Sequence, residues 1–425
     1  MKSCQLLRAQ ASTSAFTYAI FLSSNTAIMN FRLLLLLVAS SKITSAEPIF
    51  PSINSFANRL YNVLPKKDNL VFSPLSLHDS LSIAYEGAAG NTASSIRNAL
   101  NLSEPARSYR KMLGMLRLPM DICLEVASRI FIADDVKLKK AFRSILNDFF
   151  SDVQNINFTQ TTKAAEQINY WVKATTHNKI NQLIEETNIN EDSRALLLSA
   201  VYFKGEWMRK FPRAHMSEFY VTETETIRCL TMEHSRKAYY GENENLDVQI
   251  LRIPYKDNRF AFVLLLPRTI NGLAVLEEKL KDSDLAALAL MTTKQRVRIV
   301  LPKFQVESSF SFNAPLKQLG FSEIFSNGAN FTKMVENEDL KVDEIIQKAV
   351  IDFNEVGTEV TAANAAAIVR KSAERFVVEF KANHPFIFYI TFKPENESDA
   401  STFLLLFMGK VTVPVYLQEN PNLSV

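Results

Sequence analysis

Histidine, serine and cysteine side chains, which carry most nucleophilic and acid–base chemistry, form no recognisable catalytic arrangement in this sequence. The motifs of a nucleophile elbow, a zinc protease, a redox dithiol, a Walker loop and a dinucleotide site are all absent. The five histidines are scattered without ligand spacing, at positions 78, 177, 215, 234 and 384. Glycine, the residue of phosphate-cradling loops, occurs only 10 times. The sequence therefore indicates no catalytic residue, no metal site and no cofactor.

The segment from residue 358 to residue 372 has an unusual composition. Residues 358–369 contain five alanines and no proline, glycine or aromatic residue, and Arg370, Lys371 and Ser372 follow them. Local propensity leaves helix and strand open, because alanine favours a helix whereas the β-branched residues favour a strand. As a strand, the segment would place on one small, mostly apolar face Thr358, Val360, Ala362, Asn364, Ala366 and Ile368. Such a face could enter a sheet without overfilling the core, while a solvent-exposed helix or linker is the alternative.

Helical and strand patterns are intermixed around this segment. Helical spacing of apolar residues occurs in 53–64 and in 164–184, where one face collects Ile168, Trp171, Val172, Thr175 and Ile180. Strand patterns occur in 125–132, 195–203, 260–266, 296–301, 385–392 and 402–408. The run 260–266 is apolar on both faces, which is typical of a strand in the middle of a covered sheet. Because helices and strands do not alternate regularly, we expect an α+β fold, and no linker divides 47–425 into two domains.

The N-terminal residues have the pattern of a secretory signal peptide. Arg32 precedes the apolar run 33–39, and small residues lead to Ala46. This run is shorter than the roughly 20 apolar residues that a membrane span requires. We therefore expect translation from Met29, with Met1 as an upstream alternative, cleavage after Ala46, and secretion to the extracellular space. Loss of residues 1–46 removes four basic residues and leaves 44 basic against 45 acidic, which gives no reason to expect a nucleic acid or a membrane as partner.

Cysteines and glycosylation motifs fit an extracellular protein without a disulfide framework. Cys123 and Cys229 remain after the expected cleavage; two buried thiols are favoured, and a disulfide between them is left open. Five Asn-x-Ser/Thr motifs are candidate glycosylation sites, namely Asn101, Asn157, Asn330, Asn396 and Asn422.

Six segments resemble, in type and in order, signature segments of the serpin family. They are 69–77 (Asn-Leu-Val-Phe-Ser-Pro-Leu-Ser-Leu), 87–93, 168–180, 202–207 with Phe211, 380–390 (Phe-Lys-Ala-Asn-His-Pro-Phe-Ile-Phe-Tyr-Ile) and 407–414. Each segment alone is a weak match, whereas six in the right order across 50–416 are specific. The resemblance implies a serpin-like fold with three β-sheets, eight or nine helices, a metastable native state and an exposed reactive-site loop, here about 355–379.

The start of this loop resembles the hinge of inhibitory serpins. The resemblance rests on Asn354-Glu-Val-Gly-Thr-Glu359 and assigns hinge roles to Glu355, Gly357, Thr358, Glu359, Val360 and Ala362. In the family, a protease attacks the loop and forms an acyl-enzyme, and the freed hinge inserts into the large sheet before water releases the protease. The nucleophile belongs to the protease. The resemblance thus implies a monomeric inhibitor that forms a covalent complex with a serine protease.

The family spacing also implies the position of the cleaved bond. Counting forward from Glu355 and back from Phe380 both lead to the bond between Lys371 and Ser372, with Arg370 as the alternative bait. A long cationic side chain suits a primary pocket that carries a buried aspartate, as in trypsin. We therefore expect a trypsin-like target protease.

The resemblance further assigns the opening of the large sheet to a set of residues distant in sequence: Ser73, Ser76, Ser199, Trp207 and Gln347. Two of them depart from the family pattern. Ser199 replaces a usual asparagine and Gln347 replaces a frequent histidine, and in the family those two side chains meet. We hypothesise that Ser199 and Gln347 preserve a hydrogen bond through a different pair.

Two departures in the hinge keep a second function open. Val360 and Asn364 replace a usual alanine and threonine, and Asn364 would face inward after insertion, where an unpaired amide costs about 1–3 kcal/mol. The alternative is a non-inhibitory serpin, such as a carrier, chaperone or storage protein, whose loop is only a substrate. A heparin-type glycosaminoglycan is a further candidate partner through Arg107, Arg110, Lys111 and Arg117, although four scattered cations more often form a solvated face.

Overall fold

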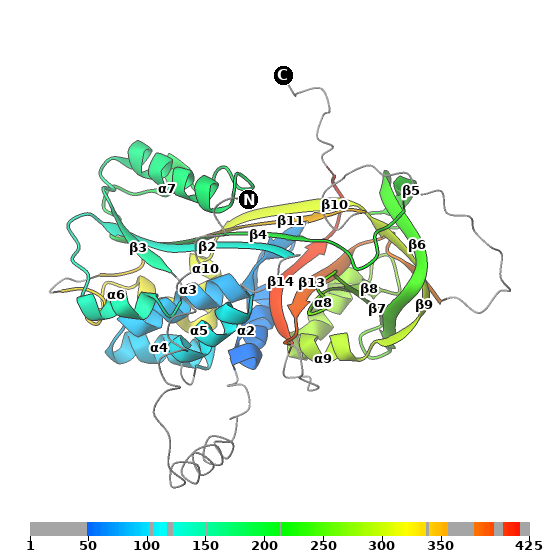
Figure 1. The fold of residues 1–425 in the computed structure, drawn as a ribbon, viewed down its shortest axis with the longest axis horizontal. Helices are drawn as coiled ribbons and strands as arrows, with labels where there is room; N and C mark the ends of the chain where they lie inside the picture. The colour runs from blue at the N-terminus through cyan, green and yellow to red at the C-terminus, as the bar shows by residue number, and fades with distance from the viewer. Residues whose placement is uncertain are drawn as a thin grey trace, which may run out of the picture. The chain divides into compact units, whose positions relative to one another are not determined.

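The described part of the chain folds into two β-sheets and nine α-helices (Figure 1). The computed structural model describes residues 49–102, 105–116, 122–149, 151–212, 214–336, 340–355, 378–394 and 403–416. Its α-helices are α2 (Ile49–Val63), α3 (Pro74–Gly87), α4 (Gly90–Leu100), α5 (Pro105–Leu116), α6 (Lys140–Leu146), α7 (Thr161–Thr175), α8 (Leu273–Lys279), α9 (Leu285–Leu290) and α10 (Asn313–Leu316). The predicted helix in 53–64 is confirmed as α2.

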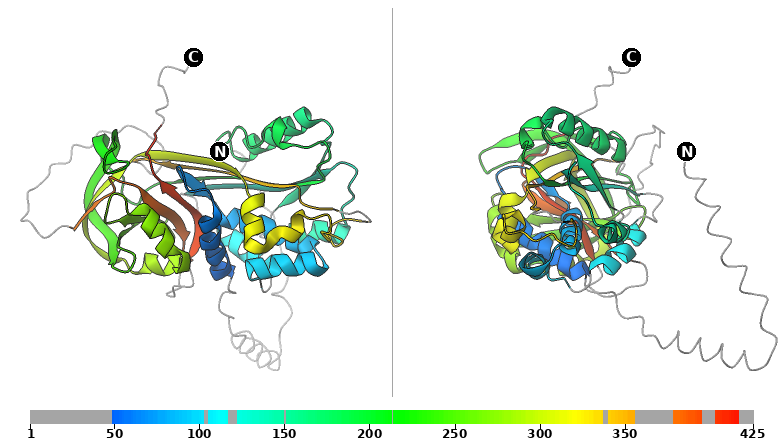
Figure 2. Two further views of the ribbon diagram at one scale, coloured as in Figure 1. Left: turned by 180° about the vertical axis from the view of Figure 1, so that it is seen from behind. Right: turned by 90° about the vertical axis from the view of Figure 1, so that its left-hand side faces the viewer.

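The first sheet has five strands in the order β10-β11-β4-β2-β3. It holds Ser199 on β4 and Gln347 on β11, and is therefore the one that the resemblance describes as the large sheet. Their bounds are β2 (Ile122–Ala133), β3 (Asp152–Ile156), β4 (Ala195–Gly205), β10 (Phe304–Ser311) and β11 (Glu344–Phe353). β4 is buried at nearly every position, because the sheet is covered on both faces. Figure 2 shows α7 on one face of this sheet and the helices α3, α4 and α5 on the other, as does Figure 1.

The second sheet has nine strands, in the order β1-β14-β13-β8-β7-β6-β9-β12 with β5 paired to β6. Their bounds are β1 (Leu70–Phe72), β5 (Ala214–Tyr220), β6 (Thr226–Asn243), β7 (Val248–Pro254), β8 (Phe260–Pro267), β9 (Thr293–Pro302), β12 (Val378–Lys381), β13 (Phe386–Phe392) and β14 (Leu404–Val411). Along β6, residues 226–232 pair with β5, residues 231–240 pair with β9, and residues 239–243 pair with β7. Two of the three expected sheets are therefore continuous through this long strand.

The ends of α3 and α7 have identifiable causes. Ser73 caps α3 by accepting a hydrogen bond from the Ser76 N–H at 3.3 Å, and Pro74 occupies the first helical position. The helical pattern in 164–184 ends earlier than predicted, at Thr175. The hydroxyl of Thr176 accepts a hydrogen bond from the Ile180 N–H at 3.1 Å. His177 and Asn178, which follow Thr176, have positive φ angles, so the chain leaves the helix at this point.

The α+β prediction, the helix number and the predicted strands are confirmed in the described residues. The doubly apolar run 260–266 is β8, a fully buried strand between β7 and β13. No described helix is long and apolar enough to cross a membrane. The expected signal region 1–46 lies outside the described residues.

Candidate functional site

The seam between β11 and β4 is a parallel pair inside the five-stranded sheet. These strands pair from Glu344 opposite Leu196 to Ile351 opposite Phe203. Each has an antiparallel neighbour on its other side, β10 for β11 and β2 for β4. A chain that reversed direction after Phe353 would run antiparallel to both β11 and β4. One parallel contact could then be replaced by two antiparallel contacts, which are slightly more stable per residue.

A row of three polar residues crosses this seam beneath the N-terminus of α3. Gln347 on β11 lies opposite Ser199 on β4, which in turn lies opposite Ser128 on β2. The Ser73 N–H donates to Gln347 Oε1 at 2.8 Å, and Gln347 Nε2 donates to the Ser73 carbonyl at 3.0 Å. The Ser76 and Ser128 hydroxyls lie 3.1 Å apart. The start of α3 is thus bonded to the strands on either side of β4.

Ser199 does not share in these bonds. Its Oγ is buried and has no hydrogen-bond partner in the described part of the chain. The hypothesis that Ser199 and Gln347 bond to each other is therefore wrong. The reason is that the backbone N–H and carbonyl of Ser73 satisfy both ends of the Gln347 carboxamide.

Trp207, which the resemblance grouped with these residues, lies instead beyond the end of β4, at the base of the loop. Its indole N–H donates to the Asn354 carbonyl at 2.8 Å. Its ring stacks on Tyr255 with a centroid distance of 4.5 Å and an interplanar angle of 12°. The edge of Phe353, the last residue of β11, contacts it at 5.1 Å between centroids. Trp207 therefore fixes the residue at which the chain leaves β11.

Glu355, the only predicted hinge residue within the described ranges, is held by a backbone hydrogen bond and by an ion pair. The Phe211 N–H donates to its carbonyl at 2.9 Å. Its carboxylate pairs with Lys303 Nζ at 2.9 Å, and both side chains are largely buried. Nearby, burial is the main cause that raises the pKa of Asp352, which accepts a hydrogen bond from Asn354 Nδ2 at 3.4 Å. The chain is thus firmly anchored up to Glu355.

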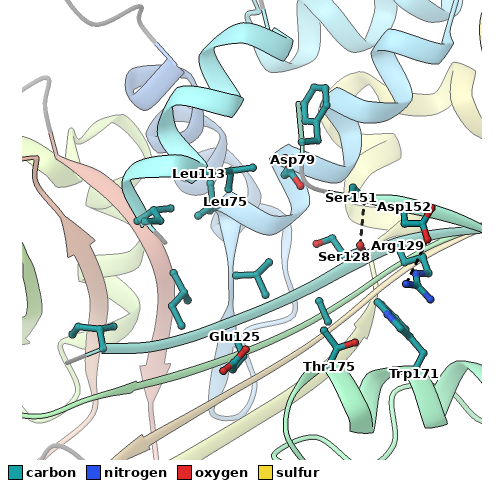
Figure 3. A pocket seen from close by; sticks show the side chains of 16 residues that line it. Leu75, Asp79, Leu113, Glu125, Ser128, Arg129, Ser151, Asp152, Trp171 and Thr175 are labelled. Atoms are coloured by element: carbon teal, nitrogen blue, oxygen red, sulfur yellow. Dashed lines mark hydrogen bonds and ion pairs between the residues drawn. The ribbon is translucent and has the colours of Figure 1, made fainter. Parts of the chain in front are cut away.

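A cavity of about 500 Å³ lies along the free edge of β2 (Figure 3). β3 pairs with β2 only from Arg129 onward, so in the described residues the earlier part of β2 lacks a strand neighbour on that side. Asp79 of α3 and Trp171 of α7 line the cavity with Ser128. Asp79 Oδ1 is buried and has no hydrogen-bond partner within the described ranges, and burial raises the pKa of this carboxyl well above its usual value. The cavity and the buried carboxyl oxygen without a partner are both expected to lower the stability of the fold.

The remaining predicted residues fall partly outside the described ranges. Gly357, Thr358, Glu359, Val360, Ala362, Arg370, Lys371, Ser372, Asn396 and Asn422 lie outside them. Asn101 and Asn330 are exposed and Asn157 is half-buried. Cys229 is a buried free thiol, while nothing is described of the Cys123 side chain. Arg110 pairs with Asp148 at 2.9 Å, so a carboxylate lies beside the predicted cations of α5.

Sequence reasoning missed the residues that complete these contacts. Ser128, Tyr255 and Lys303 lie outside the segments that resemble the family, and only the fold brings them to the seam and to the loop base. Asn354 opens the hinge segment, but its bond to Trp207 was not predicted. The one available signal was Ser128, a small polar residue inside the predicted strand 125–132. The described residues contain no cluster of three potential metal ligands.

Comparison with known proteins agrees with this geometry. The family model described as "Serpin (serine protease inhibitor)" matches residues 51–414. The chain is 34% identical to antichymotrypsin-2 of Bombyx mori over 79% of this chain and 93% of that protein, and 31% identical to antitrypsin of the same species over 83% and 93%. The crystal structure of Serpin48 from Tenebrio molitor superposes with a TM-score of 0.77 at 29% identity, covering 87% of this chain and 99% of the other.

Proposed function

Since this chain belongs to the serpin family, we propose that it is a secreted inhibitor of trypsin-like serine proteases that traps the acyl-enzyme by inserting its loop between β11 and β4. The protease serine adds to the carbonyl of Lys371, and the bond to Ser372 breaks. Ser372 leaves with the new amino group, and Lys371 stays on the protease as an ester. Insertion must then outrun hydrolysis of that ester.

One observation carries the proposal: the parallel seam lies directly beside the point where the loop begins. Glu355 follows β11 after a single residue, and a tight reversal there would direct residues 358–369 along the seam, antiparallel to both strands. The new strand would gain backbone hydrogen bonds on both sides. Its small side chains would enter a sheet covered on both faces without overfilling it.

The finer points of the proposal rest on the sequence. The choice of a trypsin-like protease rests on Lys371, with Arg370 as the alternative bait. Secretion rests on the signal pattern that ends at Ala46, and glycosylation is supported by the exposure of Asn101 and Asn330. We further propose that 47–425 acts as one domain and as a monomer.

Mixing the purified protein with trypsin and running denaturing electrophoresis tests this function. We expect a complex that survives denaturation, and mass spectrometry of the released C-terminal fragment should find Ser372 at its N-terminus. A fragment that begins at Lys371 would move the bait to Arg370. Cleavage without a stable complex would favour the non-inhibitory alternative, in which the loop is only a substrate.

A test variant and a matched control variant check which residue the protease recognises. Lys371→Ala should form the trypsin complex at least about tenfold more slowly, because the aspartate of the protease pocket loses its counter-charge. Lys381→Ala removes an exposed cation on β12, outside the proposed bait, and should leave the rate unchanged. Equal rates for the two variants would contradict the assignment of Lys371.

A further inference from the structure

A second hollow, which we call the arginine cleft, lies among β6, β7, β9 and the residues that follow Trp207. It has a volume of about 290 Å³. Its lining includes five cationic side chains and one aromatic ring, from Arg209, Arg236, Lys237, Arg252, Lys294 and Tyr239. None of the described residues that line it is acidic. The like charges concentrate a positive potential in a confined space.

Arg236 is the innermost of these cations and is only 6% exposed. Its Nη1 donates to the Arg209 carbonyl, and its guanidinium lies 4.4 Å from the centroid of the Phe211 ring. Its Nη2 is buried and has no hydrogen-bond partner in the described residues. Burial, and then the nearby charge of Arg209, lower the pKa of Arg236 to about 10. A buried guanidinium that has no carboxylate among the residues lining the cleft, and whose Nη2 has no acceptor in the described residues, is unfavourable unless a ligand supplies the missing charge and acceptor.

Of the other cations that line the cleft, Arg252 is fixed by contacts with its neighbours, whereas Lys237 and Lys294 are exposed. The Arg252 guanidinium stacks at 3.8 Å from the Tyr239 centroid, and its Nε donates to Thr292 Oγ1 at 3.3 Å. Lys237 and Lys294 are exposed at the mouth. The charge also acts on a neighbour: after burial, Arg236 and Arg209 are the causes that lower the pKa of His234. The site thus combines preorganised donors inside with exposed cations at its rim.

We propose that the arginine cleft binds a small organic sulfate or phosphate ester, with the oxyanion against Arg236. Donors converge from three strands and one loop, so a tetrahedral group with several terminal oxygens can accept from more of them than a planar carboxylate can. Tyr239, Ile253 and Pro254 offer apolar surface for the body of the ligand. The volume suits a small molecule or one sugar unit.

The cleft is connected to the base of the reactive loop through Phe211. This ring packs on Arg236, and its backbone N–H donates to the Glu355 carbonyl. An anion that neutralises Arg236 therefore binds next to the segment that anchors the loop. Binding itself can be measured on the uncut protein without any protease, so it stands or fails separately from the inhibitory function.

Isothermal titration calorimetry at constant ionic strength tests the proposal, with phenyl sulfate and phenyl phosphate as probes and neutral phenyl glucoside as the control. We expect saturable one-to-one binding of at least one ester and none of the glucoside. The ester that binds more tightly identifies whether sulfate or phosphate chemistry is preferred. Arg236→Gln should weaken binding by about tenfold or more, whereas Arg228→Gln, an exposed arginine on the same strand outside the cleft, should change it by less than about twofold.

A second variant guards against misfolding of Arg236→Gln. Lys237→Gln combined with Lys294→Gln alters only exposed side chains and should weaken binding by about threefold or more. Absence of saturable binding by both esters would overturn the proposal. So would an equal loss of affinity in the cleft variants and in Arg228→Gln, because the attraction would then be a general effect of surface charge.

Discussion

Ser199 and Gln347 lie opposite each other across the seam between β4 and β11, yet no hydrogen bond joins them. Gln347 bonds to the backbone of Ser73, and the buried Ser199 hydroxyl finds no hydrogen-bond partner among the residues that the structure describes. The uncut protein therefore carries an unsatisfied polar group at the centre of the seam that we propose to open.

We predict that Asn364 supplies the missing partner after insertion. A tight turn centred between Glu355 and Val356 places Asn364 opposite Gln347, because the two residues are equally far from it along the chain. Asn364 would then lie between Gln347 and Ser199, where its amide can bond to the Ser199 hydroxyl. Ser199 and Asn364 both depart from the family pattern, and in the inserted state each would satisfy the hydrogen-bonding group of the other.

A double-mutant cycle of Ser199→Ala and Asn364→Ala measures this coupling. In the uncut protein Ser199→Ala should be neutral or stabilising by about 1 kcal/mol, since it removes an unpaired buried hydroxyl. In the loop-cleaved protein the two substitutions should be coupled by about 0.5–3 kcal/mol. Additive effects in the cleaved protein would show that Asn364 does not reach Ser199.

Trp207→Phe should loosen the base of the loop. The substitution leaves the Asn354 carbonyl without its indole donor, which we expect to cost about 1–3 kcal/mol of unfolding free energy. Hydrogen exchange of the Phe211 N–H, the donor to Glu355, should become faster. Trp171→Phe on α7 is the matched control, because that ring packs on Phe131, away from the loop base. Equal exchange at Phe211 in both variants would argue against the anchoring role of Trp207.

Asp79→Asn should change how stability depends on pH. Burial raises the pKa of Asp79 in the folded protein above its unfolded value of about 4. The unfolded chain therefore releases this proton first, and stability falls by about 1.4 kcal/mol per pH unit as the pH rises from that value toward the folded pKa. The asparagine variant should lose this slope and be more stable at pH 7, as denaturant midpoints would show. An unchanged slope in Asp79→Asn would refute the assignment.

The sequence was most informative where local pattern decides structure. The doubly apolar run 260–266 predicted the buried strand β8, and the helical spacing in 53–64 predicted α2. It was least informative where a partner is remote. Gln347 bonds to Ser73, which lies 274 residues away in the sequence. The sequence therefore could not show that the hypothesis of a bond between Gln347 and Ser199 was wrong. Arg236 likewise reads as an ordinary surface cation, because Phe211 and Arg209, which bury it, come from another segment.

Insertion between β4 and β11 is tested most directly by the melting temperature of the protein before and after its loop is nicked by a non-target protease. A nick ordinarily lowers stability, whereas insertion of residues 358–369 adds backbone hydrogen bonds on both sides of a new central strand. We predict a rise of more than about 10 °C in the wild type. Thr358→Arg, which forces a guanidinium into the sheet, should reduce that rise and turn the protein into a substrate that is cleaved at Lys371 without forming a stable complex. An unchanged or lower melting temperature of the nicked wild type would contradict insertion and with it the proposed trap.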